Sequence, residues 1–230
     1  MSRMKPILKN GWQIETFVLS LMLQEKARVL FIYNDDYERI QQLQNELNIL
    51  PTIMDDDTEI LENARKFGFD VIFGNINSSS FDEIGSKTFD FIVAENVIQM
   101  ARYPYDFLQS AINKCDRLVL SNKNRAYWKK RLKFLFYGSH YIRNQYDVIP
   151  DDKYAWFNRN PWSLSHKDIV NLCASHSFSI NRGITIYRNG ELNNMYDIRN
   201  SPNWSADTVY YLITEDSTIQ PLYKIENSVV

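Results

Sequence analysis

Short apolar segments alternate with amphipathic segments along the first half of the chain, and this alternation constrains the fold more than any other feature. The apolar segments are short and rich in β-branched and aromatic residues, as in parallel strands that are covered on both faces. Such strands are predicted at residues 29–33, 49–54, 70–73, 89–94 and 117–120. Amphipathic helices are predicted at residues 12–24, 36–47, 58–67 and 105–114. Repeated β-α units predict a parallel sheet with right-handed crossovers and helices on both faces, a three-layer α/β sandwich.

The end of the chain has a different pattern. A helix is predicted at residues 165–178, followed by two strands at 180–186 and 208–214. Since no helix separates these strands, they are most simply antiparallel neighbours. The strand pattern therefore predicts a mostly parallel sheet that ends in an antiparallel pair. Residues 1–214 would form a single domain, and residues 215–230 a peripheral tail.

The composition argues against several classes of protein. The formal net charge of −2 over 230 residues provides no field that would attract nucleic acid. Two cysteines and three histidines form no cluster with the spacing of metal ligands. No apolar stretch approaches the roughly 20 residues that span a bilayer, and no signal peptide is evident, so we expect a cytoplasmic protein without a membrane partner.

The first strand-turn-helix unit, residues 28–43, contains no glycine in its turn. In α/β folds this turn commonly binds a nucleotide-type cofactor, and glycine lets the ligand approach the backbone closely. Here the turn is Tyr33-Asn34-Asp35-Asp36, and all seven glycines of the chain lie elsewhere. The expected ligand site has therefore been rebuilt or lost.

A parallel sheet that finishes with an antiparallel hairpin resembles the class I S-adenosylmethionine-dependent methyltransferases. Residues 89–104, FDFIVAENVIQMARYP, resemble the fourth strand and the following segment of the MetW family of methionine-biosynthesis proteins. Ser121, Asn124, Trp128, Arg131 and Leu132 resemble that family's S-x-P-N-x-x-x-W-x-x-R-L motif. The segment around residues 160–168 also fits the family. The resemblance covers residues 28–214 and implies a class I methyltransferase-like, Rossmann-like fold in a divergent member. It also implies a mostly parallel, seven-stranded sheet whose one antiparallel strand is residues 208–214.

The resemblance also assigns positions to a cofactor. The family's first strand ends in D-L-G-C-G-D-G, which surrounds the methionyl end of S-adenosylmethionine. Phe31 matches the acid of this motif, whereas Tyr33, Asp35 and Tyr37 match its glycines. These side chains occupy space that the ligand needs, so the resemblance implies a degenerate methionyl half of the cofactor site.

The adenosine half of the site is better retained. Asp55 matches the acid that binds the ribose hydroxyls, a task suited to a carboxylate because it accepts both protons. Asn75 stands where the family has an aspartate facing the adenine amine. The residues assigned to cofactor contact by the resemblance and by their place at the sheet edge are Tyr33, Asn34, Asp55, Asn75 and Glu95. No catalytic residue is identified.

Each of these positions also has a structural interpretation. Asp35, Asp36, Asp56 and Asp57 precede helices and are suitable N-caps, and Asn75 is a common turn residue. Glu95 and Asn96 would suit either a ligand site or a solvated loop. The segment Ser165-x-x-Asp168 is a variant capping box, so His166 within it is interpreted as structural rather than as a general base.

The basic and aromatic segment of residues 125–143 suggests nucleic acid at first sight. The spacing of Trp128, Leu132, Leu135 and Phe136 instead predicts an amphipathic helix with these side chains buried and its lysines in solvent. The long aromatic connection that follows, residues 138–163, is predicted to form a lid or partner-binding face over the carboxyl edge of the sheet.

Two hypotheses about function follow. In the first, the protein is a non-catalytic or weakly catalytic MetW-like protein that acts by binding another protein. The resemblance implies a homoserine O-acyltransferase as the candidate partner, and a homodimer remains open. In the second, it is an active S-adenosylmethionine-dependent methyltransferase that acts on a small metabolite and holds the cofactor in an altered pose. The glycine-free turn favours the first hypothesis.

Overall fold

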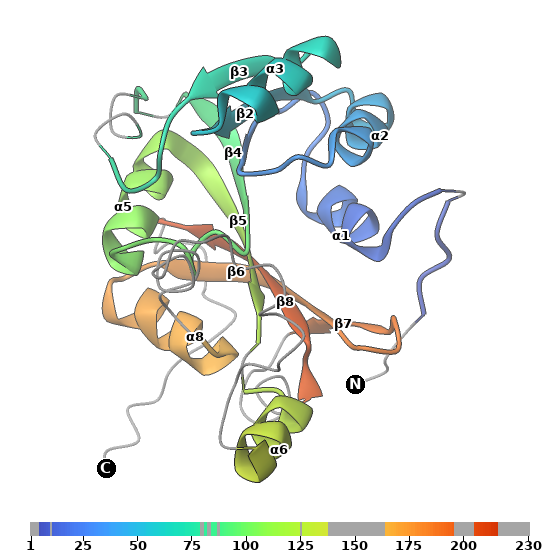
Figure 1. Cartoon of the computed structure of the whole chain (residues 1–230), viewed down its shortest axis with the longest axis vertical. Helices are drawn as coiled ribbons and strands as arrows, with labels where there is room; N and C mark the ends of the chain where they lie inside the picture. Colours follow the sequence, from blue (N-terminus) through green and yellow to red (C-terminus); the bar gives the residue numbers. More distant parts are fainter. Residues whose placement is uncertain are drawn as a thin grey trace.

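A mixed β-sheet forms the centre of the protein in the computed structural model (Figure 1). The structure describes residues 5–9, 11–78, 81, 84–86, 88–124, 126–137, 164–195 and 205–215. The predicted lid at residues 138–163, and the predicted tail beyond Glu215, lie outside these residues. The strands are β1 (Arg28–Ile32), β2 (Leu50–Asp55), β3 (Asp70–Phe73), β4 (Phe89–Glu95), β5 (Cys115–Lys123), β6 (Ser179–Ile186), β7 (Leu192–Met195) and β8 (Thr208–Thr214).

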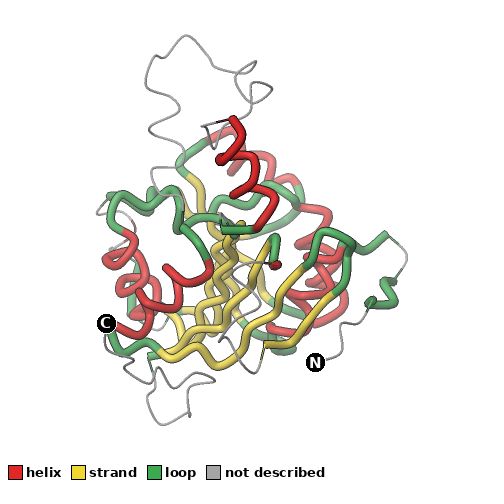
Figure 2. The backbone as a smooth tube through the Cα atoms, turned by 90° about the horizontal axis from the view of Figure 1, so that it is seen from below, coloured by secondary structure: helices red, strands yellow, loops and turns green. Residues whose placement is uncertain are grey.

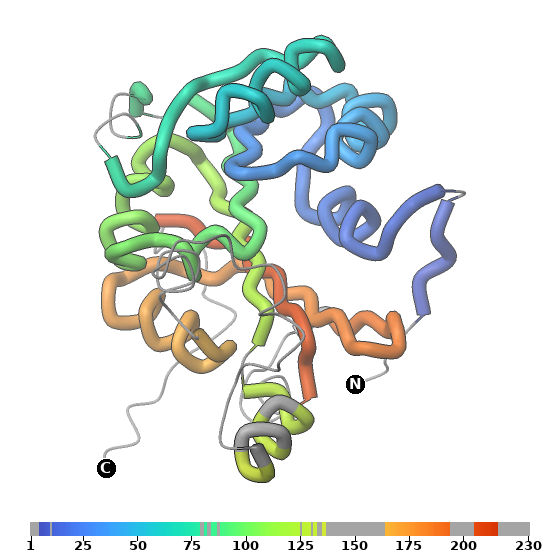
Figure 3. Tube along the Cα trace, in the orientation of Figure 1, coloured from blue at the N-terminus to red at the C-terminus, as the bar shows by residue number. Residues whose placement is uncertain are grey.

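The strand order is β3-β2-β1-β4-β5-β8-β6-β7. Strands β1 to β5 are parallel, and β8 pairs antiparallel with both β5 and β6. Figure 3 shows how the C-terminal strands, in orange and red, extend the sheet beyond β5. The predicted α/β fold with a mostly parallel sheet is confirmed.

The predicted number of strands is wrong, because the described residues form eight strands. The additional strand β7 pairs antiparallel with β6, so β7 and β8 both run against the other strands. With the sequence Leu-Asn-Asn-Met, β7 has no β-branched residue and no apolar run. Its pairing depends on the tight turn before it, where the Tyr187 N–H donates to the Glu191 carbonyl at 2.9 Å and Gly190 adopts a φ of +78°. The Asn189-Gly190 dipeptide is a hairpin signal that could have revealed this strand.

Helices cover both faces of the sheet (Figure 2). The helices are α1 (Ile14–Met22), α2 (Tyr37–Leu47), α3 (Thr58–Lys66), α5 (Pro104–Lys114), α6 (Trp128–Tyr137) and α8 (His166–Ser175). Alternate residues of β1 serve two cores, as the period of a strand requires. Val29 and Phe31 pack with α1, α2 and α3, whereas Leu30 and Ile32 pack on the face of α5 and α8. This arrangement confirms the three-layer sandwich.

Carboxylates cap α2 and α3, and a serine caps α8. Asp36 accepts from the Arg39 N–H at 3.2 Å, and Asp57 accepts from the Glu59 N–H at 2.8 Å. Ser165 and Asp168 form the reciprocal capping box predicted at the start of α8. Each cap contributes about 1 kcal/mol to the stability of its helix. The predicted capping roles of Asp36, Asp57 and Ser165 are therefore confirmed.

Helix α6 projects beyond the end of β5, at the bottom of Figure 1. The helix was expected, but its predicted burial is wrong: Leu132 is 38% exposed, Leu135 74% and Phe136 75%. At this position neither face of the sheet lies under the helix, so the apolar stripe has no such surface to pack on. Periodicity predicts an amphipathic helix correctly, but it does not say what covers the apolar side.

Candidate functional site

Tyr33 follows β1 at the carboxyl edge of the sheet, at a position that the family resemblance assigns to a glycine. Its φ of +51° lies in the left-handed region that glycine adopts most readily. The Ile76 N–H donates to the Tyr33 hydroxyl at 3.2 Å, and Ile76 lies just beyond β3. Because β2 lies between β1 and β3, the Tyr33 side chain reaches across the carboxyl end of β2. Burial raises the pKa of Tyr33 to about 12, so its hydroxyl stays neutral at physiological pH.

Asn34, the next residue, belongs to a buried polar network around Glu95 at the end of β4. The Asn34 amide donates to Glu95 Oε2 at 2.9 Å. Arg39, in the first turns of α2, donates to Glu95 Oε1 at 3.2 Å and forms a second contact with Oε2. The Tyr210 hydroxyl, from β8, also donates to Oε1. The side chains of Arg39 and Glu95 are each 10% exposed, so this is a buried ion pair with additional hydrogen bonds.

The electrostatics of this network favour the ion pair. Burial by itself lowers the pKa of Arg39, but the nearby Glu95 carboxylate outweighs it, and the net shift is upward. Burial, followed by the same carboxylate, raises the pKa of Tyr210 well above its ordinary value. Three side chains thus donate to the two oxygens of Glu95, which is largely withdrawn from solvent.

Asp55 ends β2 and is buried. One of its carboxylate oxygens accepts from the Asp57 N–H at 2.8 Å, and burial raises its pKa. Asn75 is also bound to its own surroundings, since its amide oxygen accepts from the Asn77 N–H at 2.8 Å and its amide nitrogen donates to Asp56. Both side chains therefore stabilise the loops that carry them, each by accepting from the N–H two residues on. For Asn75 this agrees with the turn interpretation.

The structure brings the five assigned residues to one edge of the sheet, in two groups. Asn34 and Glu95 are in direct contact above the end of β4. The other three lie around the ends of β2 and β3, where the Gly74 N–H donates to the Asp55 carbonyl and Tyr33 meets Ile76. Sequence reasoning missed Arg39 and Tyr210. Arg39 lies four residues before Leu43, on the apolar face of α2, and a charged residue there was a usable signal for a buried partner.

A second polar cluster lies beyond the end of β5, around the buried Asn124 of the MetW-like motif. The Asn124 amide donates to the Ala206 carbonyl, and its oxygen accepts from the N–H groups of His166 and Ala126, each at 3.1 Å. Arg131 Nε donates to the Ala126 carbonyl at 2.7 Å. Asn124 thus joins the end of β5 to the start of α8 and to the residues before β8. Asn124 and Arg131 of the motif therefore stabilise the chain around the N-terminus of α6.

His166 is fully enclosed at the start of α8. Its Nδ1 lies 2.7 Å from the Tyr211 hydroxyl, and the two rings stack with an interplanar angle of 6°. Burial lowers the pKa of His166 to about 4, so the imidazole is neutral near pH 7. Its Nε2 is buried and has no partner among the residues that the structure describes. These contacts support a structural role for His166.

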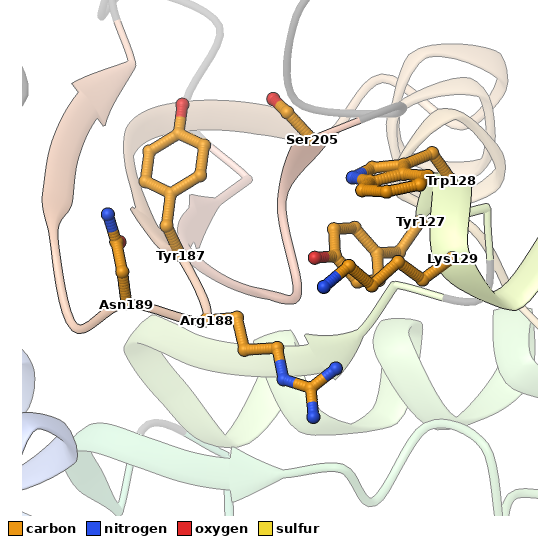
Figure 4. A pocket seen from close by; sticks show the side chains of 7 residues that line it. All are labelled: Tyr127, Trp128, Lys129, Tyr187, Arg188, Asn189 and Ser205. Atoms are coloured by element: carbon orange, nitrogen blue, oxygen red, sulfur yellow. The ribbon is translucent and has the colours of Figure 1, made fainter.

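A cavity of about 420 Å³ lies away from this edge network, between the start of α6, the β6–β7 turn and the residues before β8 (Figure 4). Its lining residues are Tyr127, Trp128, Lys129, Tyr187, Arg188, Asn189 and Ser205. Among the described residues, the lining thus combines three aromatic rings with two cations and includes no carboxylate. In the part of the chain that the structure describes, no group of three or more His, Cys, Asp or Glu side chains is placed to hold a metal ion. Within the same residues, no helix is long and apolar enough to cross a membrane.

Comparison with known families gives a match to "Methionine biosynthesis protein MetW" over residues 15–213. The chain belongs to the MetW family. This match includes β1 to β7 and most of β8, so it covers both polar clusters and the motif around Asn124. No curated protein sequence matches the chain.

Several solved structures with the same fold are described as SAM-dependent methyltransferases. A protein of Thermotoga maritima described as a possible histamine N-methyltransferase is 16% identical, with a TM-score of 0.61 over 88% of this chain and 87% of that one. A Methanosarcina mazei SAM-dependent methyltransferase is 12% identical, with a TM-score of 0.54 over 85% of this chain and 95% of that one. A further match, at 11% identity and a TM-score of 0.57 over 87% and 88% of the two chains, comes from a Haloferax volcanii methyltransferase complex with its activator Trm112. At these identities the similarity shows the fold alone.

Proposed function

We propose that this MetW-family protein acts in the cytoplasm by binding another protein, and that it transfers methyl groups weakly or not at all. One observation carries the proposal: the edge of the sheet where relatives would hold the cofactor is filled by the chain's own side chains. Tyr33 spans the ends of β1, β2 and the loop after β3, and the Glu95 network occupies the end of β4. These residues do not fit S-adenosylmethionine in the pose that the family resemblance implies.

A cofactor bound at this edge would have to displace contacts of Tyr33 and of the Glu95 network. A cofactor in that pose would need Tyr33 to swing away, which breaks its contact with Ile76 and exposes a partly buried ring. It would also need Asn34 or Arg39 to release Glu95. Separating a buried carboxylate from its cation costs about 3–5 kcal/mol, which would weaken ligand binding by two orders of magnitude or more.

The family membership suggests the partner. We propose a homoserine O-acyltransferase of methionine biosynthesis, which the MetW resemblance implies. In the Haloferax volcanii complex, a methyltransferase is bound to its activator protein. That complex concerns another protein, but it supports the idea that this fold offers surfaces for a stable partner.

Two measurements test the proposal. Calorimetric titration of the purified protein with S-adenosylmethionine and S-adenosylhomocysteine is expected to give no micromolar binding. Titration with the homoserine O-acyltransferase from the same organism is expected to give a defined complex. A micromolar dissociation constant for either cofactor would reject the first half of the proposal, and absence of a complex would reject the second half.

The alternative function, methyl transfer to a small metabolite, is supported by Asp55. This carboxylate lies at the end of β2, where the resemblance places ribose recognition. Within the described structure, it accepts hydrogen bonds from the loop that follows β2. If the protein is an active methyltransferase, Asp55→Asn would weaken a measurable cofactor affinity, whereas Asp57→Asn, which alters only a helix cap, would not.

A further inference from the structure

Helix α6 presents an apolar surface to solvent. Three of its side chains, Leu132, Leu135 and Phe136, lie on one side at helical spacing, and we name them the α6 stripe. Leu135 and Phe136 are three-quarters exposed. Side chains of this size rarely stay exposed side by side on a monomeric protein unless they serve an interaction.

Positive charge surrounds the stripe. The ten residues of α6, Trp-Lys-Lys-Arg-Leu-Lys-Phe-Leu-Phe-Tyr, contain four basic residues and no acidic one. On the helical wheel, Lys129 and Arg131 flank the stripe on opposite sides. A two-fold contact between the α6 helices of two copies would bring these like charges together, which disfavours a second copy of this chain as the occupant. The charges instead suit a carboxylate-bearing partner.

The α6 stripe continues into the cavity at the start of the helix. Trp128 lies one turn before Leu132 and lines the cavity together with Lys129. Arg188 lines it from the β6–β7 turn, and the Tyr127 hydroxyl and Lys129 ammonium point toward the space between the two sides (Figure 4). An apolar stripe thus ends at a cationic, aromatic-lined pocket.

We propose that the α6 stripe and this cavity together bind an acidic amphipathic segment of a partner protein. Apolar side chains of that segment lie along Leu132, Leu135 and Phe136, and an Asp or Glu carboxylate enters the cavity between Lys129 and Arg188. Helical segments commonly bind through anchors of this kind, at positions i, i+4 and i+7. This inference rests on the proposed function, because it names the surface that the partner contacts.

The test uses a fluorescently labelled synthetic peptide of about 15 residues, long enough to form a helix on binding. It carries leucines at i, i+4 and i+7, flanked by glutamates. A control peptide has the same leucines flanked by lysines. Fluorescence anisotropy with the full-length protein is expected to show micromolar binding of the acidic peptide. The basic peptide is expected to bind at least about tenfold more weakly.

Variants of the protein locate the binding surface. Leu135→Ser with Phe136→Ser is expected to weaken binding of the acidic peptide about tenfold or more. Because both side chains are exposed, circular dichroism should be unchanged. Phe73→Ser is the matched control, since Phe73 is 61% exposed on the distant edge strand β3, and it should leave binding unchanged. Lys129→Glu with Arg188→Glu should reverse the preference toward the basic peptide.

Each outcome decides the inference. It is overturned if the acidic peptide is not preferred, or if the stripe variant binds as the wild type does. It is also overturned if the wild type ignores the acidic peptide but sediments with vesicles rich in phosphatidylserine, because the surface would then serve a membrane. A homoserine O-acyltransferase that binds the wild type and the stripe variant equally would reject the surface and leave the proposed function standing. Peptide binding without binding of that enzyme would reject the proposed partner alone.

Discussion

Replacing Arg39 by methionine removes the cation of the buried network and keeps much of the side chain's volume. The Glu95 carboxylate, 10% exposed, would then retain Asn34 and Tyr210 as donors but lose both contacts with the guanidinium. Removing one partner of a buried ion pair usually costs about 3–5 kcal/mol. Because two donors remain, we expect a loss near the lower limit, about 3 kcal/mol.

Chemical denaturation with urea, followed by tryptophan fluorescence and far-UV circular dichroism, measures this loss. For a chain of this size, about 3 kcal/mol corresponds to a fall in Tm of roughly 6–12 °C. Arg28→Met is the matched control, because the Arg28–Asp90 ion pair is exposed, with side chains 52% and 34% accessible. Water screens such a pair, so its loss should change stability little.

A double variant separates charge from packing. If the penalty of Arg39→Met arises from an unpaired buried carboxylate, adding Glu95→Gln should restore part of the lost stability, since the amide carries no charge. The reasoning is refuted if Arg39→Met is no more destabilising than Arg28→Met. It is also refuted if Glu95→Gln adds its own full penalty to that of Arg39→Met.

Two further predictions concern Tyr33 and His166. In calorimetry, Tyr33→Gly should bind S-adenosylhomocysteine more tightly than the wild type does, because it frees the end of β2 and suits a φ of +51°, although the Glu95 network still opposes the ligand. Tyr33→Phe keeps the ring and should bind no more tightly than the wild type; equal affinities of the two variants would contradict the blocking role. His166 has a folded pKa of about 4, below its unfolded value, so the unfolded state binds the proton more strongly and stability falls as the pH drops from about 6.5 toward 4. Between pH 7.5 and pH 5, protonation of His166 in the unfolded state should lower the free energy of unfolding by about 2 kcal/mol, and His166→Gln should abolish this loss. If the urea midpoint of that variant depends on pH as the wild type's does, the prediction is wrong.

The sequence predicted the parallel half of the fold closely, for a physical reason. Strands covered on both faces need continuous apolar runs, and helices that follow them need caps, so residues 28–73 carry both signals. The ends of β5 were predicted less accurately from the sequence. This strand extends from Cys115 to Lys123, beyond the predicted residues 117–120, because its polar ends pair with Phe89 of β4 and Thr208 of β8. Such pairing depends on neighbours far along the chain and leaves no local pattern.

The candidate site was predictable in position but not in content. The carboxyl ends of parallel strands meet at one edge, so Asn34, Asp55 and Glu95 were expected there because each follows a predicted parallel strand. Their actual partners were not, because Arg39 and Glu95 are 56 residues apart and Tyr210 is 115 residues from Glu95. The exposure of α6 was missed for a related reason. Helical periodicity predicts an apolar side, but it does not show whether another part of the same chain packs on that side.

Tyr33 connects the fold to the proposed function. A tyrosine at a φ of +51° is strained relative to glycine by about 1–2 kcal/mol, yet the backbone still makes the turn that glycine would make easily. The turn thus has a backbone shape that suits glycine, while the Tyr33 side chain fills the space beside the end of β2. The contact with Ile76 and burial of the ring help to offset the strain. A protein that used this turn for a cofactor would gain nothing from such a residue. A protein that uses the fold as a rigid support for surfaces such as α6 gains a filled edge that needs no ligand for its stability.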